Sequence, residues 1–412
     1  MQTILFSLSR FPRIEFGAGK IQLLPEKIAL YGQRVLIITG QHSFYGSPAW
    51  KELTVQLESS AIQWFHSRIS GEPSPEYIDS TVQKFHKQNI NCVVAIGGGS
   101  ALDAGKAISG LLITGDSVMN YLEGVGAGKT YSGPAVPFIA LPTTAGTGSE
   151  ATKNAVLSHI AKNGYKKSFR DEQLIPQYAI VDPDLLISCP KSLIAANGMD
   201  ALTQLLESYL STKANPLTDA LALSGLERVR DSLLLWYQSS AGDCSTGDSS
   251  AGHSHQPELA LARANMAYAA LLSGITLAQV GLGSVHGLAS PLGAFFPIPH
   301  GVACGTVLTE AVRINIQAMQ EREPDNIGLS KYAHIGRLLN KKPQLSDSEA
   351  LQALVDFLSD WNRKMTIAPL SEFGISEQDI PRLVANISPS SMQTNPIILT
   401  QEEKEALVRN CL

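Results

Sequence analysis

The sequence predicts a two-part fold, an α/β domain with a mostly parallel sheet followed by an all-α domain. Up to about residue 185, short and almost continuous apolar runs alternate with helix-like segments. After Pro190 the strand-like runs stop, and apolar residues recur every three to four positions. Buried strands alternating with helices are typical of a parallel sheet covered on both faces. We therefore assign residues 1–184 to the α/β domain and residues 185–412 to the helical domain.

The predicted strands are apolar runs that end at glycine, proline or aspartate. They comprise residues 34–40, 92–97, 137–142 and 178–182, with an earlier strand ending at the Phe16-Gly-Ala-Gly19 run. The predicted helices of the second domain carry apolar residues at helical spacing. They comprise residues 192–211, 215–238, 258–280, 302–320 and 346–358. Residues 239–257 form a low-complexity polar stretch, which we interpret as a surface loop.

Composition excludes several classes of protein. The chain has 412 residues, of which 44% are hydrophobic and 17% charged, as in globular proteins. A net charge of −5 gives no reason to expect nucleic acid or an anionic membrane as a partner. The five cysteines are scattered and lack a C-x-x-C pair, which favours a reducing compartment. Because we also find no signal peptide or apolar run of about 18 residues, we expect a cytoplasmic location.

Two glycine-rich turns follow predicted strands and open the next segment. Residues 97–106 read GGGSALDAGK, and residues 141–150 read LPTTAGTGSE. Glycines allow a ligand to approach the backbone, and the free N–H groups of a helix N-terminus bind phosphate. Neither turn has the G-x-G-x-x-G spacing, and such turns also occur for steric reasons alone. Two of them at one edge of a sheet would form a groove for a dinucleotide.

A second group of residues has the donors that a divalent metal requires. Asp200 and Gln204 are four apart, so they share one face of the predicted helix. His286 and His300 are two of only nine histidines, and three prolines between them could fold the chain back. A single buried histidine is more often a hydrogen-bonded core residue than a ligand. The combination of an acid, an amide and two imidazoles is what predicts a metal site.

Four motifs together resemble the iron-containing (group III) alcohol dehydrogenase family. They are GGGSALDAGKAIS (97–109), LPTTAGTGSEAT (141–152), NGMDALTQLLESYLS (197–211) and GLGSVHGLASPLGAFFPIPHGVACGTVL (281–308). The resemblance covers most of the chain. It implies a dinucleotide-binding α/β domain, a helical metal-binding catalytic domain, and an architecture shared with dehydroquinate synthase. It also implies a metal-dependent hydride transfer between NAD(P)(H) and an alcohol, aldehyde or ketone.

The resemblance implies one divalent metal, iron or zinc, on Asp200, Gln204, His286 and His300. The family usually has a histidine at the position of Gln204, and an amide oxygen is a weaker donor than imidazole. Many members also have a histidine at the position of Ser290. We include Ser290 among the predicted catalytic residues, together with Asp200, His286 and His300. Because a hydroxyl is no base near neutral pH, proton movement would depend on water or the cofactor ribose.

The end of the second strand bears on the choice of cofactor. NAD-dependent members often have an aspartate there, whereas this chain has Gly40, with Ser43 shortly after. Loss of the carboxylate favours NADP, with NAD as the alternative. The resemblance implies further cofactor contacts at Gly98, Gly99, Ser100, Asp103, Thr143, Thr144, Thr147, Asn154 and Lys166. Lys167 could equally take the role of Lys166.

The predicted activity is that of an alcohol dehydrogenase or aldehyde reductase. One alternative is a cyclase-like lyase of the same fold that acts on sugar phosphates, and another is a degenerate nucleotide-binding protein. We expect a small alcohol or aldehyde as the substrate and a homo-oligomer, such as a dimer, as the assembly.

Overall fold

The structure, a computed structural model, describes residues 5–41, 43–161, 164–240 and 256–412. It divides into two compact units. The α/β unit comprises Ser9–His159 and Gly164–Cys189, and the helical unit comprises Pro190–Leu412 with residues 5–8 and 160–161. The sequence analysis predicted this division between residues 184 and 185. Leu185 packs against the core of the α/β unit, so the chain leaves that unit a few residues later.

The described strands of the α/β unit form a parallel sheet of six and a separate antiparallel pair. The order in the sheet is β1-β8-β5-β4-β2-β3, and every neighbouring pair is parallel. The bounds are β1 Arg13–Phe16, β2 Arg34–Gly40, β3 Gln63–Ile69, β4 Cys92–Gly97, β5 Phe138–Pro142, β6 Asn154–His159, β7 Tyr165–Arg170 and β8 Tyr178–Val181. The predicted parallel sheet is confirmed.

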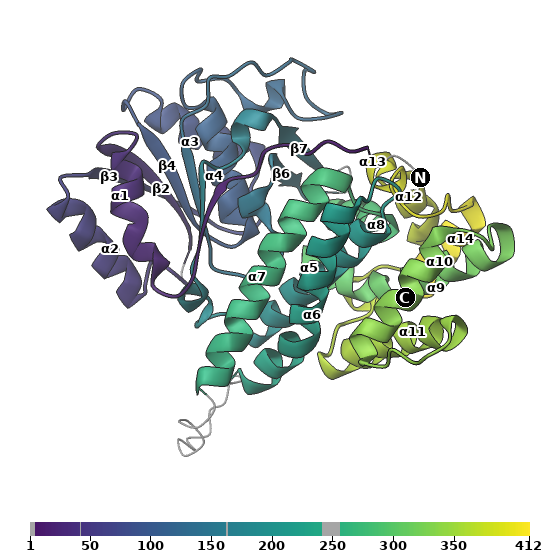
Figure 1. Ribbon diagram of the computed structural model, residues 1–412. Helices are drawn as coiled ribbons and strands as arrows, with labels where there is room; N and C mark the ends of the chain where they lie inside the picture. Colours follow the sequence, from purple (N-terminus) through teal and green to yellow (C-terminus); the bar gives the residue numbers. More distant parts are fainter. Residues whose placement is uncertain (1–4, 42, 162–163, 241–255) are drawn as a thin grey trace. The chain divides into compact units, whose positions relative to one another are not determined.

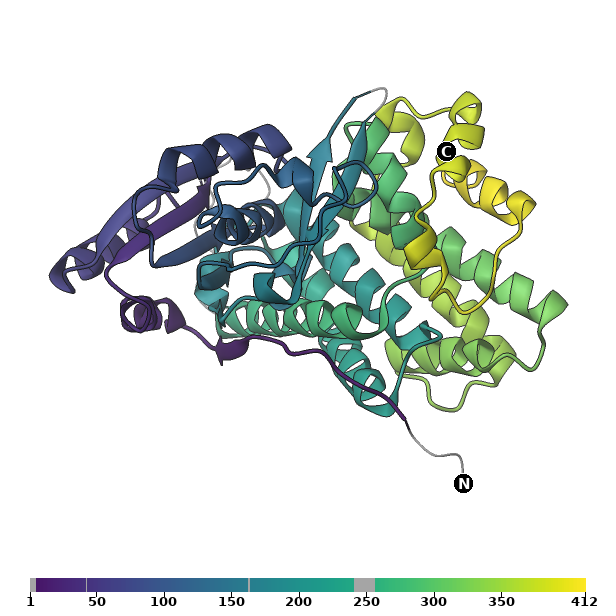
Figure 2. The same ribbon diagram turned by 90° about the horizontal axis from the view of Figure 1, so that it is seen from above.

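Helices cover both faces of this sheet (Figures 1 and 2). They are α1 Leu24–Ala29, α2 Pro48–Ser59, α3 Pro75–Phe85 and α4 Gly99–Leu111. Leu36 and Ile38 of β2 belong to the core that contains α3 and α4, whereas Val35 and Ile37 belong to the core with α1 and α2. Successive side chains of a strand point to opposite faces, so a strand buried on both faces is continuously apolar.

The sequence prediction missed β3 and the β6–β7 ribbon. β3 is the edge strand of the sheet, and most of its side chains are only partly buried. β6 and β7 pair only with each other among the described strands, and β7 is rich in charge. None of these strands is therefore a continuous apolar run, because strands exposed on one side or at an edge alternate in polarity.

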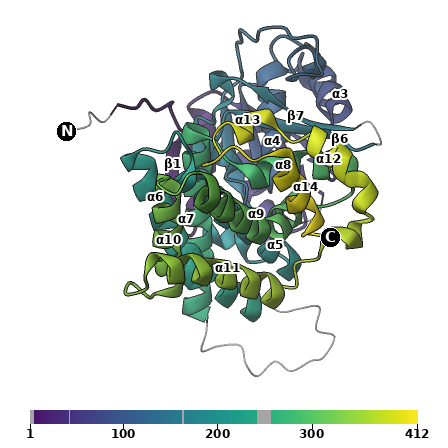
Figure 3. The same ribbon diagram turned by 90° about the vertical axis from the view of Figure 1, so that its right-hand side faces the viewer.

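The helical unit is built from long helices that pack side by side (Figure 3). Its helices are α5 Lys191–Leu210, α6 Pro216–Ser239, α7 Gln256–Val280, α8 Ser284–Phe295, α9 His300–Arg322, α10 Ile327–Asn340, α11 Asp347–Lys364, α12 Ile380–Ala385, α13 Pro389–Met392 and α14 Gln401–Arg409. α5 contacts α6, α7 and α9. Pro291 lies within α8, and Pro297 and Pro299 lie in the segment between α8 and α9, with Pro299 directly before α9.

The predicted polar loop at 239–257 lies almost entirely outside the described residues. Across the residues that the structure describes, no single helix is both long and apolar enough to cross a membrane. Only the pair Pro257–Val280 and Ser284–Phe295, which is bent by 101°, meets that test jointly.

His66, on β3, is a partly buried titratable group beside the end of β2. Its Nε2 lies 2.9 Å from Thr39 Oγ1, and its ring stacks on Tyr45. Burial, together with the positive charge of Arg68, lowers the pKa of His66 to about 4. The folded protein therefore keeps this ring neutral at a pH where the unfolded chain, with a pKa of about 6.5, binds a proton.

We predict that stability falls as the pH drops from about 6.5 towards 4, and that His66→Gln reduces this fall. Melting temperatures of the full chain across this pH range test the prediction. His159→Gln, which changes an exposed histidine, is the control. An identical pH dependence in His66→Gln and wild type would contradict the prediction.

Candidate active site

Three helices of the helical unit bring Asp200, His286 and His300 together. Asp200 lies on α5, His286 near the start of α8, and His300 is the first residue of α9. Asp200 Oδ1 lies 3.2 Å from His286 Nε2 and 3.9 Å from His300 Nε2. Asp200 is 1% exposed and His286 7%. Residues up to 100 positions apart in the sequence thus form one cluster of donors that could hold a metal, with Asp200 and His286 buried and His300 partly exposed.

Gly301 explains how α9 approaches α5 so closely. A Cβ atom at this position would lie 2.3 Å from the backbone oxygen of Ala196, which is far inside van der Waals contact. Only glycine allows the two backbones to meet at this point. The contact is one residue after His300 and one helical turn before Asp200, so it sets the separation of these two side chains.

Glu207 holds His286 in place. This buried carboxylate lies on α5, two turns after Asp200, and its Oε2 is 2.6 Å from His286 Nδ1. It also accepts the backbone N–H of Val285 at 2.7 Å through Oε1. A carboxylate on one ring nitrogen fixes the tautomer and directs the other nitrogen, here Nε2, towards a metal. Sequence reasoning missed Glu207, although its spacing of seven from Asp200 is that of one helix face.

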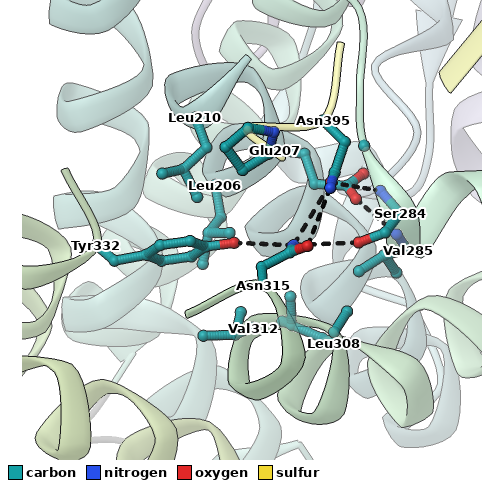
Figure 4. Close-up of a pocket in the computed structure, with 13 residues that line it drawn as sticks. Leu206, Glu207, Leu210, Ser284, Val285, Leu308, Val312, Asn315, Tyr332 and Asn395 are labelled. Atoms are coloured by element: carbon teal, nitrogen blue, oxygen red, sulfur yellow. Dashed lines mark hydrogen bonds between the residues drawn. The ribbon is translucent and has the colours of Figure 1, made fainter. Parts of the chain in front are cut away.

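A polar network extends from Glu207 beneath the start of α8 (Figure 4). The first N–H of α8, on Ser284, donates to Asn395 Oδ1 at 3.0 Å. Asn395 in turn donates to Asn315 Oδ1, and Asn315 Nδ2 donates to Tyr332 Oη. α8 has no side-chain cap of its own, so Asn395 and Glu207 satisfy its free N–H groups from other segments. The network fixes the helix that carries His286.

The charges around Asp200 favour a cation. Burial alone would raise the pKa of Asp200, but His300 and His286 outweigh it and lower that pKa. Burial would likewise lower the pKa of His286, but Cys304 and the two carboxylates raise it well above its ordinary value. Asp200 Oδ2 is buried and has no hydrogen-bond partner among the described residues. An unpaired, buried carboxylate oxygen is costly, and a bound metal would satisfy it.

The structure adds Cys304 to this cluster. One ligand atom each from Asp200, His286, His300 and Cys304 lie within 4.8 Å of one another. Burial raises the pKa of the Cys304 thiol to about 12. The sequence analysis did not select Cys304, although it lies four residues after His300, on the same face of one helix.

The other two residues predicted for this site lie on the same helices. Gln204 is buried on α5, and its Oε1 accepts a hydrogen bond of 2.6 Å from Ser273 Oγ on α7. Ser290 lies one turn after His286, and its hydroxyl donates to the carbonyl of His286 at 3.3 Å. Both side chains therefore have partners within the protein.

In the α/β unit, the two glycine-rich turns lie side by side. Gly97 and Pro142 are register partners at the carboxyl ends of β4 and β5, and Thr143 N–H donates to Gly97 O at 2.9 Å. A Cβ atom at Gly99 would lie 2.8 Å from Thr147 Cγ2, and one at Gly98 would lie 3.3 Å from Thr144. The turns thus pack through their glycines and threonines. α4 begins at Gly99 with no side-chain cap, and the first N–H groups of such a helix end can bind a ligand.

Asp103 is engaged within the protein. It accepts hydrogen bonds from Ser149 Oγ and from the N–H of Val156, and it pairs with the fully buried Lys106 at 3.3 Å. Lys106 Nζ also donates to Ser149, Thr152 and the carbonyl of Asn154 at 2.6–2.9 Å. This ion pair therefore joins the two turns to β6. Asp103 has a structural role whatever its contact with a cofactor.

The remaining residues predicted for the cofactor lie on β2, α4, β6 and β7, except Ser43, which follows β2. Gly40 ends β2, and Ser43 is exposed three residues later. Ser100 lies in the first turn of α4, and Asn154 begins β6. Lys166, on β7, forms an ion pair of 3.0 Å with Glu72.

The paired glycine-rich turns of the α/β unit and the cluster of possible metal donors in the helical unit are the features to compare with known proteins. Two family models match the chain, iron-containing alcohol dehydrogenase over residues 12–183 and the C-terminal domain of the Fe-containing alcohol dehydrogenase family over residues 194–412. The chain therefore belongs to the iron-containing alcohol dehydrogenase family. This match confirms the predicted oxidoreductase class, and it gives no support to the lyase or to the degenerate binding protein.

Individual relatives agree over nearly their whole lengths. The chain is 28% identical to the NAD-dependent methanol dehydrogenase of Bacillus methanolicus over 405 residues, 97% of this chain and 98% of that protein. It is 31% identical to the lactaldehyde reductase of Escherichia coli (strain K12), covering 89% of each. The crystal structure of a 1,3-propanediol oxidoreductase superposes with a TM-score of 0.85 at 26% identity, covering 99% of this chain and 100% of that one.

We predict that Glu207→Gln weakens metal binding by roughly 10–100-fold, because the amide no longer fixes the orientation of His286. Zinc affinity measured by competition with a chelator tests the prediction. Glu310→Gln is the control, because it removes another carboxylate of the helical unit, one that pairs with Arg313. Equal affinities for Glu207→Gln and wild type would refute the orienting role of Glu207.

Proposed function

We propose that this protein is an alcohol dehydrogenase or aldehyde reductase that uses one divalent metal and NADP. The observation that carries the proposal is the cluster of Asp200, His286 and His300, in which the buried Asp200 Oδ2 has no hydrogen-bond partner among the described residues. The family supports the class of reaction. The relatives act on different small alcohols and aldehydes by name, so we propose only that broad substrate class.

The residues present fit a divalent metal, iron or zinc. Asp200 supplies the charge that anchors it, His286 and His300 supply imidazole nitrogens, and Glu207 keeps the His286 ring in position. The sequence prediction adds Gln204 to these ligands. When bound, the metal acts as a Lewis acid on the substrate oxygen.

The nicotinamide would supply the chemistry of hydride transfer in either direction, and the protein contributes position and electrostatics. We place the dinucleotide on the turns of Gly98, Gly99 and Ser100 and of Thr143, Thr144 and Thr147, with Asn154 and Lys166 as further contacts. Ser290 lies close to His286 in α8, and its hydroxyl could pass a proton only with the help of water or the cofactor ribose.

Three features support NADP over NAD. Gly40 has no carboxylate to repel a 2′-phosphate. Ser43 is exposed beside it, where its hydroxyl could donate to the phosphate. Arg68, on β3, is the register partner of Thr39, so its guanidinium lies next to the end of β2, 4.8 Å from the Tyr45 ring centre. An arginine at this place in a dinucleotide fold accommodates the 2′-phosphate. The methanol dehydrogenase relative is NAD-dependent by name, which makes the cofactor worth testing directly.

We also propose a reducing, cytoplasmic location and a homo-oligomer. Cys92, Cys189, Cys304 and Cys411, the cysteines that the structure describes, form no disulfide.

β1 lies at the edge of the sheet, and Phe11, Ile14 and Phe16 in and near it are at least 36% exposed. An exposed apolar edge strand favours association.

The experiment that tests the function combines elemental analysis with turnover. We predict near-stoichiometric metal in the wild type and consumption of NADPH with small aldehydes. Asp200→Ala and His286→Ala should abolish both, and Ser290→Ala should slow turnover without loss of metal. Wild-type metal content and rate in Asp200→Ala, or turnover without net change in cofactor absorbance, would refute the proposal.

The cofactor preference has its own test in Gly40→Asp. A Cβ atom at Gly40 meets no other atom within 4 Å, so aspartate fits there. Two like charges about 4 Å apart near a protein surface repel by roughly 1–4 kcal/mol, so we predict that kcat/KM for NADP relative to NAD falls roughly tenfold or more. Gly40→Ala, which adds the Cβ atom without charge, should leave the ratio near the wild-type value. A wild type that prefers NAD would overturn the NADP proposal.

A further inference from the structure

Asp200, His286 and His300 supply three donors to the proposed metal site, and a fourth protein donor remains to be identified. The sequence analysis assigned this place to Gln204, whose neutral amide oxygen is a weak metal donor. The structure places a different side chain beside Asp200, His286 and His300, the thiol of Cys304. Cys304 is fully buried on α9, one turn after His300, so the two side chains lie on one face of the same helix.

The distances fit a single coordination sphere. Cys304 Sγ lies 3.7 Å from His286 Nε2 and 3.8 Å from His300 Nε2, and Asp200 Oδ1 lies 3.2 and 3.9 Å from the same two atoms. Zinc bonds are about 2.0–2.2 Å to nitrogen or oxygen and about 2.3 Å to sulfur. At a tetrahedral angle, two such donors lie roughly 3.3–3.6 Å apart. Three of the four distances lie slightly above that range and one slightly below it, all within about 0.3 Å.

A second observation points to a cation between these donors. Asp200 Oδ2 is buried and lacks a hydrogen-bond partner among the described residues, and the Asp200 side chain is only 1% exposed. The carboxylate that contributes Oδ1 to the cluster therefore has unused acceptor capacity. A metal held by Asp200 and its neighbours would compensate for this.

Gln204 already has another partner. Its Oε1 lies 2.6 Å from Ser273 Oγ on α7, and the side chain is buried. A thiolate is also a stronger and softer donor than a neutral amide oxygen.

We propose that Cys304, in place of Gln204, supplies the fourth protein ligand, giving a site of one carboxylate, two imidazoles and one thiolate. This inference rests on the proposed metal site. On binding, the metal–sulfur bond replaces the S–H bond of Cys304, and the proton passes to the solvent. Soft sulfur donors select zinc, so the site should favour zinc or cobalt over iron(II).

Cobalt(II) is the probe, because a thiolate bound to it gives a sulfur-to-metal charge-transfer band in the near ultraviolet. The metal-free full chain is titrated with cobalt(II), and zinc affinity is measured by chelator competition. We expect the band in the wild type and its loss in Cys304→Ala. Zinc affinity of that variant should fall by at least the roughly 10–100-fold typical of a lost supporting contact.

Matched variants separate this ligand from other sources of the band. Cys411→Ala removes another buried cysteine of the helical unit and should keep the band and the zinc affinity. Gln204→Leu should also keep the band. If Cys304→Ala does not fold, as judged by circular dichroism, Cys304→Ser replaces it.

The outcomes distinguish the two proposals. Cobalt binding without the band in the wild type, or a band that survives loss of Cys304, would overturn the thiolate ligand and leave the metal site standing. A loss of metal in Gln204→Leu as large as in Cys304→Ala would also overturn it. If the wild type binds neither cobalt nor zinc, the proposed function itself fails.

Discussion

The geometry of the candidate site depends on the carboxylate of Glu207. It bonds to the backbone N–H of Val285 and to the ring of His286, so it fixes both the start of α8 and the rotation of the side chain that α8 carries. A negative group at a helix N-terminus is also favourable because it meets the positive end of the helix dipole. Asp200 lies two turns earlier on the same helix. One helix therefore provides a metal donor and the support for a second donor.

Gly283 shows how tightly this arrangement is built. A Cβ atom at this position would lie 2.8 Å from Asn395 Oδ1 and 2.9 Å from Glu207 Oε1. Any larger residue would push away the two side chains that cap α8. Together with Gly301, where two helix backbones meet, it places a glycine next to each histidine-bearing helix start. These two positions require glycine because there is no room for a side chain, not because of unusual backbone angles.

The sequence predicted the strands inside the sheet and the edge strand β1, which the Phe16-Gly-Ala-Gly19 run marks, and it missed β3 and the β6–β7 ribbon. The runs at β2 and β4 match the predicted strands residue for residue, because a strand between two helical layers is apolar throughout. β3 and the β6–β7 ribbon carry no such pattern. For the site, Asp200 and the two histidines were identifiable by type and motif. Glu207 and Cys304 were not, because their roles depend on how α5, α8 and α9 pack, which spacing within one helix does not reveal.

The buried Lys106 has a consequence for how the segments around the two glycine-rich turns move. Its ammonium group holds Asp103 on α4, Ser149 and Thr152 in the second turn, and the carbonyl of Asn154 at the start of β6. Moving any one of these segments away would leave the buried Lys106 charge without one of its partners, which is strongly unfavourable. They should therefore open and close as one cooperative unit, with backbone amides that exchange with solvent at a shared rate.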